Sequence, residues 1–166
     1  ENNGHTIEVS FKNPKNTLTI GDDVYKLQQF HFHAPSENEI DGQTYPLEGH
    51  FVYKTDNGKI TVISVLYNYG DENQALKQIW DKMPQAANTE TELSQPISLD
   101  DFYPEDKDYY NFEGSLTTPP CTEGVNWIVF KNQETVSKEQ VEKFTQTLGF
   151  KNNRPIQDTN GRQIKE

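Results

Sequence analysis

The chain of 166 residues contains one cysteine, Cys121, so it cannot form an intrachain disulfide bond. No stretch approaches the roughly 18 apolar residues of a membrane-spanning helix. Basic residues are also scarce, with 15 Lys and Arg against 26 Asp and Glu and a net charge of −11. Because a strongly acidic chain is repelled by phosphate, we expect neither nucleic acid nor an anionic membrane surface as a partner.

Apolar residues make up only 32% of the chain, but nine Phe, eight Tyr and two Trp supply large side chains for a core. The length fits one domain, spanning residues 1–166. Alternating or apolar patterns predict strands over residues 6–11, 17–20, 24–33, 45–54, 59–69 and 125–131. Asn57-Gly58, between two of these strands, predicts a hairpin.

Two segments show helical periodicity. Residues 71–83 place four apolar side chains on one face, with Asp71 as the expected N-cap. Residues 137–148 begin with a capping box of Ser137 and Gln140 and stop at Gly149. The polar, Pro-containing stretch 84–111 is predicted to be a long surface connection. The pattern therefore indicates a mainly β protein of the α+β class, with peripheral helices.

Three of the four histidines fall into one inferred site. Side chains alternate along a strand, so His31 and His33 face the same way, while Phe30 and Phe32 face an apolar layer. His50 lies 17 residues after His33 in the next long strand and reaches the same point if the two strands pair. Three imidazoles with one open position are the arrangement of a catalytic zinc site.

Two polar neighbours are placed to orient these imidazoles. Metal-bound histidine commonly donates its second N–H to a carboxylate or carbonyl oxygen. Gln29 shares a strand face with His31, and Glu48 shares one with His50. Each is therefore a candidate hydrogen-bond partner of its neighbour.

Five motifs in one colinear order resemble the bacterial branch of the α-class carbonic anhydrases. They are QFHFH (29–33), PSEN (35–38), YPLEGH (45–50), GSLTTPPC (114–121) and NRP (153–155). The resemblance implies a large central, mostly antiparallel, twisted sheet with short peripheral helices. It also implies a zinc-dependent enzyme that reversibly hydrates carbon dioxide to bicarbonate and a proton.

The resemblance assigns roles to further residues. His31, His33 and His50 would bind zinc, Thr117 would be a gatekeeper bonded to Glu37, and His5 would be the proton shuttle. Thr118 would contact bicarbonate or inhibitors. The apolar pocket for carbon dioxide would be lined by Val52, Val62, Leu116 and Trp127. Expected ligands are carbon dioxide, bicarbonate and sulfonamide inhibitors, the expected location is periplasmic or secreted, and a homodimer is left open.

The chain departs from the family at its beginning. Family members usually carry several dozen residues before the shuttle motif, including in bacterial members a cysteine that pairs with the one at Cys121. We expect this N-terminal portion to be absent here and Cys121 to be a free thiol or to pair between chains. Glu8, where family members often have a neutral amide, is expected to add negative charge near the cavity.

Two other interpretations stay open on the sequence. His31-x-His33 followed by Glu37 mimics part of a cupin metal motif, in which Glu37 would be a ligand, although no second cupin block follows. A carbonic-anhydrase-like domain without catalytic activity is the other alternative. It is favoured by the missing N-terminal portion and opposed by the presence of all three histidines.

Overall fold

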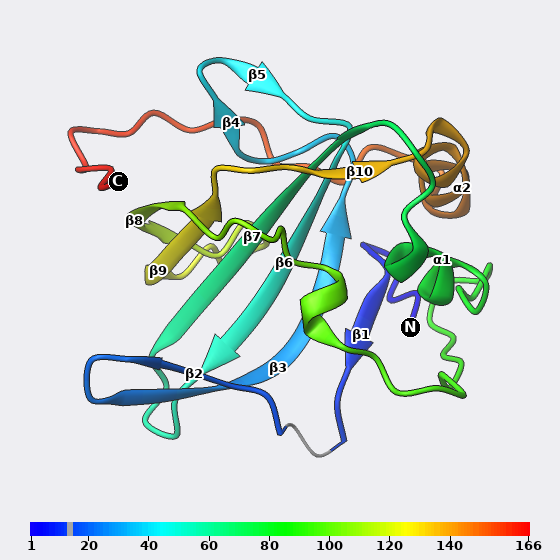
Figure 1. Ribbon diagram of the computed structural model, residues 1–166, viewed down its shortest axis with the longest axis horizontal. Coiled ribbons are helices and arrows are strands. Elements are labelled where there is room, and N and C mark those ends of the chain that lie inside the picture. Colours follow the sequence, from blue (N-terminus) through cyan, green and yellow to red (C-terminus); the bar gives the residue numbers. More distant parts are fainter. Residues whose placement is uncertain (13–14) are drawn as a thin grey trace.

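The computed structural model describes residues 1–12 and 15–166, and it is built on one twisted sheet of eight strands (Figure 1). Six strands follow the order β1-β3-β6-β7-β9-β8, while β2 pairs with β3 and β10 pairs with β7. The bounds are β1 Glu8–Ser10, β2 Thr17–Ile20, β3 Asp23–His33, β6 Leu47–Lys54, β7 Ile60–Tyr69, β8 Tyr109–Ser115, β9 Glu123–Phe130 and β10 Glu134–Val136. A separate hairpin joins β4 Glu39–Ile40 to β5 Gln43–Thr44.

Most strand pairs are antiparallel, as predicted. Only β7 with β9 and β10 with β7 are parallel among the paired strands of the described residues. β6 and β7 form the predicted hairpin, with Lys54 opposite Ile60. Gly58 in its turn has φ +93, a conformation that glycine adopts without steric cost.

The main hydrophobic core lies on one face of this sheet. Phe30, Phe32 and Phe51 are fully buried there, and Phe32 packs against Trp80 of α1 (Gln74–Trp80) and Phe144 of α2 (Lys138–Leu148). Figure 1 shows both helices gathered at one end of the sheet, beside the N-terminus. This aromatic layer fixes the central strands from behind, so the opposite face is free to carry polar groups.

The helix over residues 71–83 begins later and ends earlier than predicted, and Asp71 is not its N-cap. α1 covers Gln74–Trp80, and the Asn73 side chain accepts a hydrogen bond from Leu76 N. Asn73 is buried and also donates to Thr135 O, whereas Asp71 is exposed. Both Asp and Asn can cap a helix, and tertiary contacts place Asn73, not Asp71, at the N-cap of α1.

The prediction of a surface connection over residues 84–111 is wrong in its second half. A 3-10 helix, Leu99–Asp101, leads into Phe102, which is buried in the core beside Phe30, and β8 begins at Tyr109. β4, β5 and β10 were not predicted either, because two or three residues carry too little periodicity. None of the helices in the described part of the chain is long and apolar enough to span a bilayer.

The capping box of the second helix is confirmed and extends into a link between the two helices. The Gln140 side-chain oxygen accepts from Ser137 N and from Asn73 N, while its amide nitrogen donates to Asn73 O at 2.8 Å. The backbone oxygen of Gln140 accepts from Trp80 Nε1. Gln140 is buried, so these bonds are shielded from water.

We predict that Gln140→Ala lowers the free energy of unfolding by about 2–3 kcal/mol, because it leaves buried backbone groups of Asn73 unpaired. Urea denaturation measures the change. Gln146→Ala, at an exposed position of the same helix, is the matched control and should change stability by less than about 0.5 kcal/mol. Equal effects of the two substitutions would refute the link.

Candidate metal centre

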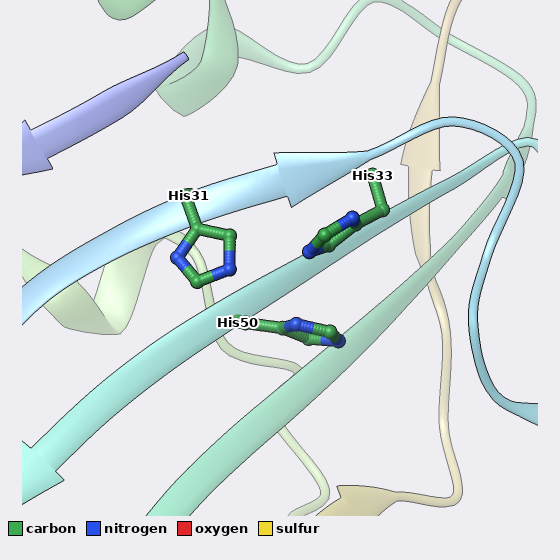
Figure 2. Close-up of side chains that lie close together, drawn as sticks. All are labelled: His31, His33 and His50. Atoms are coloured by element: carbon green, nitrogen blue, oxygen red, sulfur yellow. The ribbon is translucent and has the colours of Figure 1, made fainter. Parts of the chain in front are cut away.

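Pairing of β3 with β6 brings the three histidines together. His31 and His50 are direct partners across the two strands, and His33 lies two residues further along β3. Figure 2 shows the three rings, from β3 and β6, converging on one space. One ligand nitrogen from each histidine lies within 4.8 Å of the others. The predicted metal cluster is therefore formed by the fold.

One ring nitrogen of each histidine is held by an oxygen acceptor. His31 Nδ1 lies 2.7 Å from Gln29 Oε1, and His50 Nε2 lies 2.9 Å from Glu48 Oε1. His33 Nδ1 donates to the backbone oxygen of Asn152 at 3.0 Å. The hydrogen bonds to Gln29 and Asn152 place the proton on Nδ1 of His31 and of His33, so Nε2 of each of these rings keeps a lone pair. The nearby Glu48 carboxylate favours the proton on Nε2 of His50.

The free lone pairs have the chemistry of a metal site. His33 Nε2 is buried and has no hydrogen-bond partner, an arrangement that is costly unless a ligand satisfies it. Burial, with the neighbouring imidazoles, holds the pKa of His31 well below its usual value, and burial lowers the pKa of His33 as well. Although burial opposes it, the carboxylate of Glu48 raises the pKa of His50. Imidazole nitrogens are typical zinc ligands, and a catalytic zinc site has three protein ligands and one open position.

Glu48 ties the site to the chain segment that follows β3. Its carboxylate is fully buried and accepts hydrogen bonds from Glu37 N, Asn38 N and the Asn38 side chain. Ser64 on β7 donates a further bond at 2.5 Å. Burial raises the pKa of this carboxyl, but His50 and these donors lower the pKa by more, so its net shift is downward. Glu48 is therefore an ionised acceptor for His50.

Glu37 and Thr117 lie on the same cavity, which has a volume of about 740 Å³. Glu37 Oε1 accepts from Arg154 N at 2.6 Å, while Oε2 is buried without a partner. Among the described residues no hydrogen bond joins Glu37 to Thr117, so their expected contact stays a prediction. The three-histidine cluster does not include Glu37, contrary to the cupin interpretation.

The four apolar residues expected to line a pocket belong to one cluster on the site face of the sheet. Val62 and Trp127 are buried in it, and Val52 and Leu116 pack against it. Val52 pairs with Val62 across β6 and β7, and Val62 pairs with Trp127 across β7 and β9. The Trp127 ring lies 4.9 Å from that of His50. Thr118 is exposed in the turn after β8.

His5 lies in an ordered turn ahead of β1. The Asn3 side chain accepts hydrogen bonds from His5 N and Thr6 N, and Gly4 has φ +81. The His5 side chain is exposed. Glu8 pairs opposite His31 across β1 and β3, so the extra carboxyl group is near the site, where burial and Glu1 raise its pKa. Strand β1 is shorter than the predicted 6–11, and the Thr6 hydroxyl before it donates to Phe32 O.

Sequence reasoning gave no role to Asn152 or Arg154, although Arg154 lies in one of the recognised motifs. Asn152 supplies the acceptor for His33, and Arg154 supplies a donor for Glu37. Both partners are more than 100 residues away, so no local pattern points to them. Cys121 is half-buried and is a free cysteine with φ +55.

Carbonic anhydrases match this chain both in sequence and in fold. The profile of eukaryotic-type carbonic anhydrase matches residues 1–166. A carbonic anhydrase of Neisseria gonorrhoeae is 48% identical over the whole chain, which spans 66% of that protein. The α-carbonic anhydrase of Thermovibrio ammonificans, solved with sulfanilamide, superposes with a TM-score of 0.95 at 46% identity. The match covers 98% of this chain and 72% of the Thermovibrio chain.

A more distant structure agrees. The carbonic anhydrase Cah3 of Chlamydomonas reinhardtii, solved with acetazolamide, has a TM-score of 0.91 at 33% identity, over 99% of this chain and 74% of its own. This chain thus spans about two thirds of the length of the bacterial relative. The matched sequence, the sheet and the three imidazoles together place the chain in the eukaryotic-type, or α-class, carbonic anhydrase family.

Proposed function

We propose that this chain binds one zinc ion on His31, His33 and His50 and reversibly hydrates carbon dioxide to bicarbonate and a proton. The observation that carries the proposal is the set of three converging imidazoles, each with one nitrogen beside an oxygen of Gln29, Asn152 or Glu48. A bound zinc ion supplies Lewis acidity that lowers the pKa of water to about 7.

Glu37 and Thr117 orient the attacking water in this proposal. The Glu37 carboxylate can only accept hydrogen bonds when it is ionised, and its free Oε2 can accept one from the Thr117 hydroxyl. The Thr117 oxygen can then interact with the water only through its lone pairs, so it accepts a hydrogen bond from the water. The oxygen lone pair of the water is thereby aimed at carbon.

The apolar wall holds the substrate. Carbon dioxide is neutral and has no hydrogen to donate, so Val52, Val62, Leu116 and Trp127 can bind it by dispersion and exclusion of water. Thr118, exposed in the turn after β8, is the proposed contact for bicarbonate. Weak binding of both molecules suits turnover in either direction.

His5 receives the proton that the reaction releases. A histidine imidazole can accept a proton from water and pass it to a buffer molecule. Its exposed side chain gives it access to solvent, and the turn around Asn3 gives its backbone a fixed place. Transfer follows attack on carbon, so it limits kcat and leaves kcat/KM for carbon dioxide unchanged.

Aromatic sulfonamides are proposed as inhibitors at the same site, on the basis of the relatives solved with sulfanilamide and acetazolamide. We further propose a periplasmic or secreted location by analogy with bacterial members of the family, which cell fractionation tests. A homodimer is a further proposal, tested by sedimentation.

A second candidate function is zinc binding without catalysis. One observation favours it: Glu37 and Thr117 line the same cavity, but no hydrogen bond joins their side chains in the described residues. A carbon dioxide hydration assay on the zinc-loaded chain separates the two candidates. Zinc binding without hydration would establish the second.

We predict one zinc per chain, with zinc–nitrogen distances of about 2.0–2.1 Å. His33→Ala should abolish stoichiometric zinc, because it removes one of three ligands. Elemental analysis after dialysis measures the content. His5→Ala changes the remaining histidine and should keep full zinc, so equal loss in both variants would mean that the metal lies elsewhere.

We predict that Thr117→Val lowers kcat/KM by about 100-fold with zinc content unchanged, as expected when one preorganised hydrogen bond is lost. Valine keeps the shape and removes only the hydroxyl. Thr122→Val, at an exposed position of the same loop, is the control and should behave as the unsubstituted chain. An unchanged kcat/KM in Thr117→Val would exclude the gatekeeper role.

A further inference from the structure

The side chain of Asn152 joins two segments that lie far apart in sequence. Its amide nitrogen donates to His5 O at 3.1 Å and to Phe32 O at 2.9 Å, and its oxygen accepts from Ala34 N at 2.9 Å. Its backbone oxygen accepts from His33 Nδ1. One residue therefore contacts the turn that carries His5 and the end of β3 that carries His33.

These bonds use every polar group of the amide in a way that depends on geometry. The two donated bonds go to carbonyls on separate segments, and the acceptor takes a third backbone group. They can be satisfied together only when the His5 turn lies against the end of β3. The Asn152 amide therefore stabilises one relative position of the His5 turn and the end of β3.

His5 depends on this support because its imidazole makes no hydrogen bond within residues 1–12 and 15–166. Its backbone is held at two points, by Asn3 Oδ1 at its N–H and by Asn152 at its carbonyl. The first contact is local, within the turn, and does not relate His5 to the metal ligands. Of these two bonds, only the second ties His5 itself to the strand that holds His31 and His33. The next anchor to β3 is Thr6, whose hydroxyl donates to Phe32 O and accepts from Phe32 N.

We propose that Asn152 is a positioning residue that holds His5 at a fixed separation from His33, and so from the metal. The inference rests on the proposed function, in which His5 takes up the released proton. Proton transfer through ordered water needs hydrogen-bond contact at each step, so a drifting His5 breaks the chain of contacts. The amide side chain of Asn152 thereby acts on proton transfer, and its backbone oxygen acts on the metal ligand.

Two variants separate the side chain from the backbone. Asn152→Asp keeps the shape, the backbone oxygen and the acceptor for Ala34 N, but sets a carboxylate oxygen against the carbonyls of His5 and Phe32. Asn152→Ala removes the clamp without adding charge. Asn73→Asp is the matched control, since it keeps the cap on Leu76 N and loses one amide donor bond, to Thr135 O, and Asn73 makes no bond to His5.

In weak buffer, we expect both Asn152 variants to lower kcat by about 10-fold with kcat/KM for carbon dioxide unchanged. Added imidazole should restore the lost kcat, because it carries the proton from solution. Combined with His5→Ala, either variant should cause no further loss. A fall of kcat/KM in parallel with kcat, or additive losses in the double variant, would overturn the proposal.

Amide hydrogen exchange tests the same contact without any activity. The His5 and Thr6 amides should exchange on the order of 10-fold faster in both Asn152 variants, since the turn opens more often, and at the original rate in Asn73→Asp. Unchanged exchange in the Asn152 variants overturns the inference. Should neither variant fold, free exchange of these amides in the unsubstituted chain overturns it, and strong protection supports it.

The two proposals fail in distinguishable ways. If the zinc-loaded chain does not hydrate carbon dioxide, the proposed function fails and hydrogen exchange alone decides the structural role of Asn152. If the chain is active and His5→Ala leaves kcat unchanged, His5 is not the shuttle and Asn152 cannot act through it. If His5→Ala lowers kcat but the Asn152 variants do not, only the inference on Asn152 is wrong.

Discussion

The buried carboxylate of Glu48 is the constraint on which the site depends. A charge without exposure to water is very costly unless it is fully hydrogen-bonded, and Glu48 meets this demand with donors from Glu37, Asn38 and Ser64, besides His50. These donors come from the turn after β3, from β6 and from β7. Satisfying one carboxylate therefore fixes both the orientation of a metal ligand and the backbone that carries Glu37.

The two faces of the sheet divide the work between stability and chemistry. Behind the sheet, stacked aromatic rings such as Phe30 on Phe51 and Trp80 on Phe144 form a buried, close-packed layer. On the opposite face, imidazoles alternate with those rings along β3. Ligands on paired central strands are held more rigidly than ligands on loops, which suits a site whose geometry must not relax.

Much of the arrangement follows from patterns within a few residues. Alternation along one strand places His31 and His33 on the face opposite Phe30 and Phe32, and Gln29 beside His31, as the structure confirms. The capping box of α2 is equally local and was correctly predicted. The shift of α1 to an Asn73 cap was not, because Gln140 from the other helix holds Asn73 in place.

The sequence by itself determined the strand pattern, the shared face of His31 and His33, and the polar neighbours Gln29 and Glu48, because each follows from the two-residue period of a strand. Pairing of β3 with β6, a tertiary contact, brings His50 to the other two histidines. Tertiary structure alone decided that Asn152 accepts from His33, that Arg154 donates to Glu37 and that β8 closes one end of the sheet order. These contacts join the last part of the chain to its first third, or one edge of the sheet to its neighbour. Their energies depend on how distant segments pack, and no local periodicity records that.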